Sequence, residues 1–180
     1  MLRWESGVAH EHADELAEEE PLEIRVRGRN ISITMRTPGH DDELAAGFLL
    51  GEAMIGRRAD VLRIEPCAKN EFGNTIDVVL APDVPVDFNR LTRNVFASSS
   101  CGICGKASID SILQSLDPIE SKVQFDATLI TQLPALMHAE QQTFHRTGGL
   151  HAAALFGEDG RMIVLREDVG RHNAVDKVIG

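Results

Sequence analysis

Two short runs near the start of the chain, Leu22–Arg27 and Ile31–Arg36, alternate apolar with polar or charged residues. A repeat of two is typical of β-strands that bury one face. Gly28-Arg29-Asn30 between the runs supplies the residues of a turn. The pattern therefore predicts a β-hairpin with one face in water.

The next stretch changes from the repeat of two to an Ala- and Leu-rich composition. Thr37-Pro38-Gly39 interrupts the strand, and Leu44–Ile55 is predicted to be a helix. His40 or Asp41 stands at the N-cap position, and the acidic residues 42–43 suit a first helical turn. Capping accounts for Asp41 without any functional role.

Two further strands are predicted at Val61–Glu65 and Thr75–Leu80, joined by a turn within residues 70–74. Cys67 lies at the end of the first of these strands. Because no second thiol or histidine is close to it in sequence, we interpret it as a small structural residue. The prolines and polar residues of 82–94 indicate a connector to the rest of the chain.

Helical spacing of apolar residues dominates the following segment. A helix is predicted over Lys106–Leu116, and a longer one from Asp126 or Thr128 to about His145, with Pro134 expected to kink it or to delay its start. The predicted apolar face of the longer helix comprises Ile130, Leu133, Leu136 and Met137.

A second hairpin is predicted near the end of the chain. Residues 147–156 form a glycine-rich turn that enters a buried strand, and residues 161–166 form the returning strand. Residues 167–177 then place acidic, imidazole, amide and guanidinium groups at the junction of this strand with a helix. Such a concentration is either a solvated cap or a polar site, and its apolar neighbours favour a site.

Composition limits the class of protein. The chain has 180 residues, of which 43% are hydrophobic, and a formal net charge of -10. These values predict one moderate domain or two small ones and argue against binding to a nucleic-acid backbone. The sequence has no apolar run of about 20 residues, and its N-terminus is acidic where a secretory signal would be basic. We therefore expect a cytoplasmic protein without a membrane span, whose residues 1–20 form an acidic, flexible tail.

Two of the three cysteines, Cys101 and Cys104, stand in a Cys-x-x-Cys pair flanked by small residues. The predicted helix that follows and the adjacent Lys106 would both favour a thiolate, so the pair is a candidate nucleophile. A zinc site would need two further ligands close in sequence, and a thioredoxin-type dithiol would follow a first strand. A structural disulfide is disfavoured by the lack of an export signal. The residues alone leave these alternatives open.

Four longer motifs resemble the FdhD family of formate dehydrogenase accessory sulfurtransferases. The similarity runs from about Glu20 to the last residue, and the motifs follow one another in the family's order. They are Thr37–Leu50, Ser99–Lys106, Thr147–Ala153 and Arg166–Lys177.

The resemblance implies a sulfur carrier. Such a protein accepts sulfane sulfur from a cysteine desulfurase and passes it to the molybdenum bis-guanine-dinucleotide cofactor of formate dehydrogenase. It also implies a homodimer and an α/β fold, in which residues 91–180 form a cytidine-deaminase-like three-layer domain and residues 21–90 a smaller β-containing lobe with one helix. Because the family usually continues well beyond Gly180, the sequence is expected to be truncated.

The resemblance also assigns the site. Cys101 is expected to carry the persulfide, with Cys104 as its partner, and no resident metal or permanent cofactor is expected. Contacts to the molybdenum cofactor are expected where glycine allows close backbone approach and a helix N-terminus offers donors. These positions are Gly148, Gly149, His151, Asp168, Gly170, Arg171, His172 and Asn173.

Sulfur transfer has three alternatives. A chaperone would bind the molybdenum cofactor without moving sulfur, and a dithiol oxidoreductase would exchange disulfides. A zinc deaminase is disfavoured, because its signature places His-x-Glu before the cysteines. Here His151 follows them, and Ala153 stands where the acid should be. His151 could equally be a core imidazole with a single partner.

Overall fold

The computed structural model describes residues 2–11, 13–67, 73–86, 88 and 119–180. Its largest sheet has four strands in the order β4-β3-β6-β5. β3 (Glu20–Val26) and β4 (Arg29–Arg36) form the predicted antiparallel hairpin. β5 (Val61–Pro66) and β6 (Thr75–Leu80) confirm the two further strands, and β6 lies parallel to β3. The sheet is therefore mixed.

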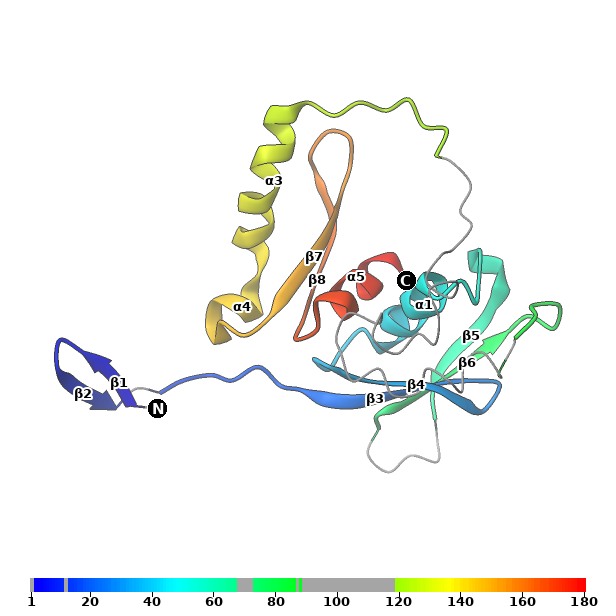
Figure 1. The fold of residues 1–180 in the computed structure, drawn as a ribbon, viewed down its shortest axis with the longest axis horizontal. Helices are drawn as coiled ribbons and strands as arrows, with labels where there is room; N and C mark the ends of the chain where they lie inside the picture. Colours follow the sequence, from blue (N-terminus) through cyan, green and yellow to red (C-terminus); the bar gives the residue numbers. More distant parts are fainter. Residues whose placement is uncertain (1, 12, 68–72, 87, 89–118) are drawn as a thin grey trace, which may run out of the picture.

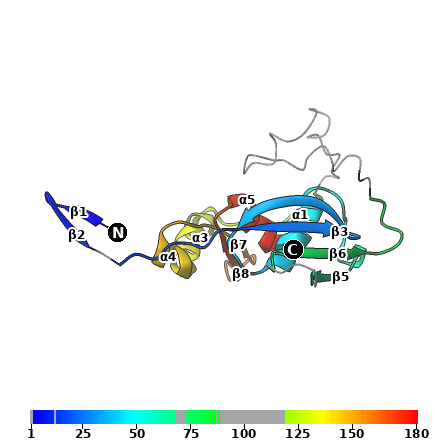
Figure 2. The same ribbon diagram turned by 90° about the horizontal axis from the view of Figure 1, so that it is seen from below.

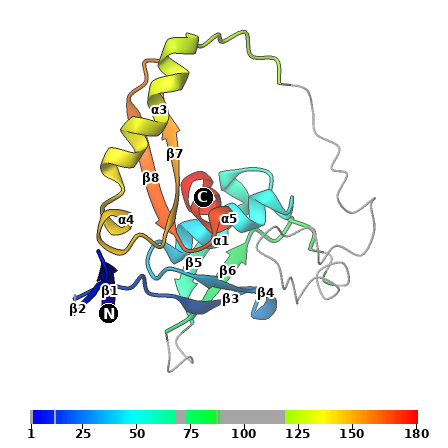
Figure 3. The same ribbon diagram turned by 60° about the vertical axis from the view of Figure 1, so that its left-hand side comes forward.

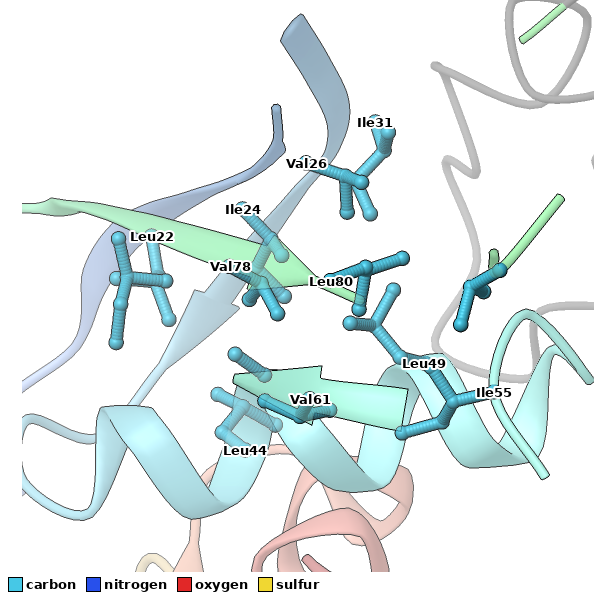
Figure 4. Packing of buried hydrophobic residues seen from close by; sticks show 13 residues of the cluster. Leu22, Ile24, Val26, Ile31, Leu44, Leu49, Ile55, Val61, Val78 and Leu80 are labelled. Carbon is cyan, nitrogen blue, oxygen red and sulfur yellow. The ribbon is translucent and has the colours of Figure 1, made fainter. Parts of the chain in front are cut away.

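α1 (Asp41–Gly51) covers one face of this sheet (Figure 4). Alternate residues of the strands point toward the helix, as the repeat of two predicts. The resulting core is contiguous and apolar. Its fully buried members include Leu22, Ile24, Val26, Leu44, Leu49 and Val78.

α1 begins after His40, one of the two predicted cap positions, but its capping contacts and its end differ from the prediction. His40 is the N-cap, but it has the left-handed conformation (φ 57°) and makes no side-chain capping bond within the described part of the chain. Asp41 does not cap the helix either, because its carboxylate accepts two hydrogen bonds from Arg36, at 2.9 and 3.0 Å. The helix ends at Gly51, before Ile55, and Ala53 takes a positive φ of 54°.

The C-terminal segment begins with two helices. α3 (Ala127–Glu140) starts after Asp126, whose side chain caps it as predicted, and it contains Pro134. α4 (Gln142–Thr147) is separate, so the single helix predicted to His145 is wrong. The apolar face of α3 is also rotated from the prediction. Leu129, Leu133 and Met137 are partly buried, whereas Ile130 and Leu136 are about half exposed.

β7 (His151–Phe156) and β8 (Met162–Asp168) form the second predicted hairpin, and α5 (Arg171–Ile179) follows it. Figure 3 shows β7 and β8 with α3 on one side and α5 on the other. Arg166 bonds to Glu43 of α1, whereas its neighbour Glu167 bonds to the N-terminus of α4. Successive residues of β8 thus face different helix layers.

α1 and α5 pack against each other and lie between the large sheet and the β7–β8 hairpin (Figure 1). The fold is therefore mixed α/β, and the division into two lobes stays a prediction. A cytidine-deaminase-like arrangement of residues 91–180 stays a prediction. Within the described ranges, no helix is both long and apolar enough to cross a lipid bilayer.

The N-terminal residues carry secondary structure of their own. β1 (Leu2–Glu5) and β2 (Val8–Glu11) form an antiparallel hairpin that projects away from the other sheets (Figure 2). The turn is Ser6-Gly7, with φ values of 52° and 84°, which suits a tight hairpin of two residues. Residues 13–19, four of which are acidic, then run to β3, and most of them are exposed.

Candidate functional site

Three loops meet at one end of the β7–β8 hairpin. The strand register places His151 opposite Asp168, so the turn at residues 148–150 lies beside the junction of β8 with α5. The loop at residues 37–40, between β4 and α1, is attached to the same junction through Thr37. Segments more than 100 residues apart in the chain therefore share one site.

Asp168 is the centre of this junction and is completely buried. One carboxylate oxygen accepts the N–H groups of Gly170 at 2.8 Å and of the Asn173 side chain at 3.0 Å. The other accepts the Thr37 N–H at 3.1 Å and lies 2.7 Å from the Lys177 ammonium. A buried carboxylate is tolerated only with such compensation, so these contacts define its role as structural support.

Lys177 and Asn173 extend the contacts to β4 and its loop. The ammonium of Lys177, also buried, donates to the Thr37 carbonyl at 2.8 Å. Asn173 donates to the Met35 carbonyl at 2.8 Å and accepts from the Thr34 hydroxyl at 3.2 Å. The result is a fixed connection between the start of α5 and the loop at residues 37–40.

The surface of the junction presents basic and imidazole side chains. Arg171 and His172 are exposed in the first turn of α5, and His151 is exposed at the start of β7. The first turn of α5, all of whose residues are described, carries no acidic side chain. Backbone N–H groups at a helix N-terminus together with a guanidinium group favour an anion. The arrangement can therefore hold a phosphate or carboxylate.

Two glycines are required by this geometry. Gly148 ends α4 in the left-handed conformation (φ 66°), which glycine adopts without strain. Gly170 precedes α5, and a Cβ there would lie 2.8 Å from the Asn173 side-chain nitrogen. Glycine at both positions keeps the turn and the helix start in place.

An ion pair connects α1 to β8 beside the site. The Arg166 guanidinium bonds to both carboxylate oxygens of Glu43, with the longer contact at 2.6 Å, and His40 lies 3.2 Å from the same carboxylate. The hydrogen bonds from Arg166 lower the pKa of Glu43, although its partial burial opposes this shift. The same bonds raise the pKa of Arg166. The first turn of α1 carries three acidic residues and therefore repels anions. In this it differs from the first turn of α5, which favours them.

The register of β7 and β8 places His151 and the preceding glycine turn beside the junction at residues 168–173, where cofactor contacts were expected. Asp168 and Asn173 lie inside the junction and are engaged by protein groups, so they can act on a ligand only by positioning their neighbours. Cys101 and Cys104 lie outside the described residues, as does the helix predicted at 106–116. Sequence reasoning gave no role to Lys177. A signal existed, because Asn173, Ala174 and Lys177 recur at helical spacing on the buried side of α5.

Cys67 follows β5 directly, as predicted, and its N–H bonds to the Thr75 carbonyl at 2.9 Å. The partly buried thiol lies 3.8 Å from a guanidinium nitrogen of Arg25, beside a shallow cavity of about 360 Å³ on the sheet face opposite α1. Among the residues that the structure describes, no group of three or more His, Cys, Asp or Glu side chains could hold a metal ion.

Comparisons with known proteins point in one direction. Residues 17–180 match the family model described as the FdhD/NarQ family. The chain is 47% identical over 189 residues to the sulfur carrier protein FdhD of Streptomyces coelicolor, covering 100% of this chain and 67% of that protein. It is 48% identical over 175 residues to the protein of the same name from Mycobacterium tuberculosis, covering 92% and 63%.

A solved structure shows the same fold. It is the crystal structure of a protein from Desulfotalea psychrophila, described as a candidate formate dehydrogenase accessory protein. It superposes with a TM-score of 0.73 at 23% identity, covering 99% of this chain and 65% of that one. The chain thus spans about two thirds of the length of these relatives.

Proposed function

The chain belongs to the FdhD/NarQ family, and on that premise we propose that it is a sulfur carrier for the maturation of formate dehydrogenase. The observation that carries the proposal is the 47% identity, across the whole chain, to a protein named as a sulfur carrier. The mixed α/β fold agrees with this assignment, since a formate dehydrogenase accessory protein candidate has the same fold.

In this proposal Cys101 is the sulfur-carrying residue. Its thiolate attacks the terminal sulfur of a persulfide on a cysteine desulfurase. The bond between the desulfurase cysteine and that sulfur breaks, the desulfurase cysteine leaves as a thiolate, and a persulfide forms on Cys101. Cys104 is the partner thiol. The acceptor is the molybdenum bis-guanine-dinucleotide cofactor, which is a substrate of the transfer.

The anion-favouring surface at the start of α5 supports a place for the cofactor. Arg171 and His172 would contact a pyrophosphate, and the turn at Gly148 and Gly149 would let the backbone approach it. Asp168 and Asn173 would act indirectly by fixing the start of α5, and Gly170 and His151 would border the ligand. We further propose a cytoplasmic homodimer with a deaminase-like C-terminal domain, in line with the sequence resemblance.

The decisive experiment follows sulfur by mass spectrometry. The protein is mixed with a cysteine desulfurase and cysteine, and protein-bound sulfur is measured on intact protein and on peptides. We expect one added sulfur on Cys101, which is lost in Cys101→Ser and kept in the control Cys67→Ser. Absence of added sulfur on both Cys101 and Cys104 would leave the cofactor-chaperone alternative. Disulfide exchange with model substrates would favour the oxidoreductase.

A second experiment tests the cofactor surface separately from sulfur transfer. Guanosine diphosphate serves as the probe, because it carries the pyrophosphate and base of one half of the cofactor. We expect Arg171→Gln with His172→Gln to weaken its binding by at least tenfold in calorimetry. Arg161→Gln, which removes an exposed charge from the β7–β8 turn, is the matched control. Equal binding by the wild type, the double variant and the control would mean that the cofactor does not bind at the start of α5.

A further inference from the structure

α5 crosses α1 with the backbones in direct contact. A Cβ atom on Gly47 would overlap the carbonyl oxygen of Asp176, and one on Gly180 would overlap that of Glu43. Only the absence of side chains at these positions allows the two helices to lie so close. The backbone of Asp176 is therefore held against α1, and one of its side-chain oxygens would lie 3.7 Å from a Cβ on Gly51.

The charged groups around Asp176 are mostly of its own sign. Glu52 approaches from the end of α1, and Asp168 from β8. Lys177, the neighbouring cation on α5, is engaged by Asp168 and by the Thr37 carbonyl. β7, which also packs against α5, carries only His151 as a titratable residue, and that side chain is exposed. An ionised Asp176 thus meets carboxylates in a partly buried contact.

We propose that Asp176 is a proton-dependent contact that sets how tightly α5 lies on α1. With the carboxyl protonated, the helices pack closely and the junction around Asp168 is held firmly. Ionisation places a third carboxylate near Glu52 and Asp168 and loosens the crossing. Because α5 also carries the anion-favouring first turn, the change reaches the surface where a ligand would bind.

The pH range of this effect follows from burial. Desolvation, with smaller contributions from Glu52 and Asp168, raises the pKa of Asp176 from 3.8 to about 7. The folded state therefore binds the proton more tightly than the unfolded state does. Asp176 then lowers the free energy of unfolding progressively as the pH rises from about 4 to about 7, and has no further effect above that range.

The test compares the wild type with Asp176→Asn, which keeps the shape of the side chain but cannot ionise. Melting temperatures are measured from about pH 5 to about pH 8. We expect the melting temperature of Asp176→Asn to rise relative to that of the wild type across this range, by about 3 °C or more between the acidic and the alkaline end. Asp14→Asn removes the same charge from the exposed N-terminal segment and should follow the wild type at every pH.

Hydrogen exchange of the α5 amides locates the effect. After correction for the intrinsic pH dependence of exchange, α5 protection should fall across neutral pH in the wild type and stay constant in Asp176→Asn. Glu52→Gln provides a second variant that keeps Asp176, and it should move the fall in protection to lower pH. The proposal is overturned if Asp176→Asn retains the wild-type pH dependence of melting, or if α5 protection does not change with pH in the wild type and in Glu52→Gln.

The sign of the Glu52→Gln shift follows from electrostatics. Glu52 raises the pKa of Asp176 through like-charge repulsion, so its neutralisation allows Asp176 to ionise at lower pH. Loss of that repulsion also makes the ionised contact less unfavourable. The fall in α5 protection should then also be smaller in Glu52→Gln. The pH midpoint of the fall, after normalisation for this smaller amplitude, tests the effect on the pKa. An unshifted midpoint would mean that Glu52 does not interact with Asp176.

Discussion

At the scale of single residues, the junction depends on a buried ion pair. Asp168 and Lys177 are both almost fully buried. Each also bonds to the backbone of Thr37: Asp168 accepts its N–H group, and Lys177 donates to its carbonyl oxygen. A buried pair of this kind adds little net stability over apolar side chains, but removal of one partner leaves an uncompensated charge. Its value here is positional, because it fixes where α5 begins.

Replacement of Lys177 by methionine should therefore be costly. We expect Lys177→Met to lower the free energy of unfolding by about 3–5 kcal/mol, since the Asp168 carboxylate loses its ammonium partner in a buried place. Urea denaturation measures the loss. Lys122→Met removes an exposed ammonium and should change stability by less than about 0.5 kcal/mol. A loss as small as that control would contradict the ion pair.

Glu43 gives a prediction for acid stability. Its pKa is lowered in the folded state by Arg166, so the pair stabilises the fold above pH 4.5. That contribution disappears as the pH falls through the folded-state pKa. Urea midpoints between about pH 6 and about pH 3 should show Glu43→Gln less stable than the wild type at the upper end, with the gap closing toward the lower end. The exposed Glu158→Gln should show no such gap, and a gap that persists in acid would exclude the pair as its cause.

At the scale of elements, the local sequence pattern predicted the strands and helices whose formation depends on nearby residues. The strands of the large sheet follow from the repeat of two, which is why β3, β4, β5 and β6 all lie close to their predicted bounds. The break between α3 and α4 could not be predicted in this way. α4 starts where Glu167, a residue of β8, accepts the N–H groups of Thr143 and Phe144. That capping contact exists only after the chain has folded.

The site follows the same division. Glycine turns and polar residues at a strand-to-helix junction are visible in the sequence, and they predicted both halves of the junction. The sequence predicted that β7 and β8 form a hairpin, but it did not predict the strand register that brings the two halves together. The attachment of the loop at residues 37–40 through Thr37 depends on α5 packing against α1, so no local pattern reports it.

The close crossing of α1 and α5 gives the prediction for this scale. Gly47→Ala would place a Cβ against the Asp176 backbone, which cannot move aside as a flexible side chain can, and should lower the free energy of unfolding by about 1–3 kcal/mol or more. Gly51→Ala, one turn later, meets its nearest atom at 3.7 Å and should be tolerated. Thermal or urea unfolding distinguishes the two variants, and equal stability of both would mean that the helices cross elsewhere.

At the scale of the whole molecule, apolar burial is uneven. The fully buried aliphatic side chains lie mainly between the four-stranded sheet and α1. α3, all of whose residues the structure describes, has no fully buried side chain, and Ile130 remains 52% exposed. α1 therefore contributes much more to stability than α3 does. The part of the chain that includes α3 should open more easily than the sheet.

Two leucine truncations measure this difference. Leu49→Ala removes a fully buried side chain from the sheet–α1 core and should cost about 2–5 kcal/mol. Leu133→Ala removes a partly buried side chain of α3 and should cost about 1 kcal/mol or less. In native-state hydrogen exchange, amides of α3 should exchange faster than those of β3 and β6, since local opening of a weakly packed helix needs no disruption of the core. Comparable costs for the two truncations, with equal protection of α3 and β3, would instead require α3 to be part of one cooperative core.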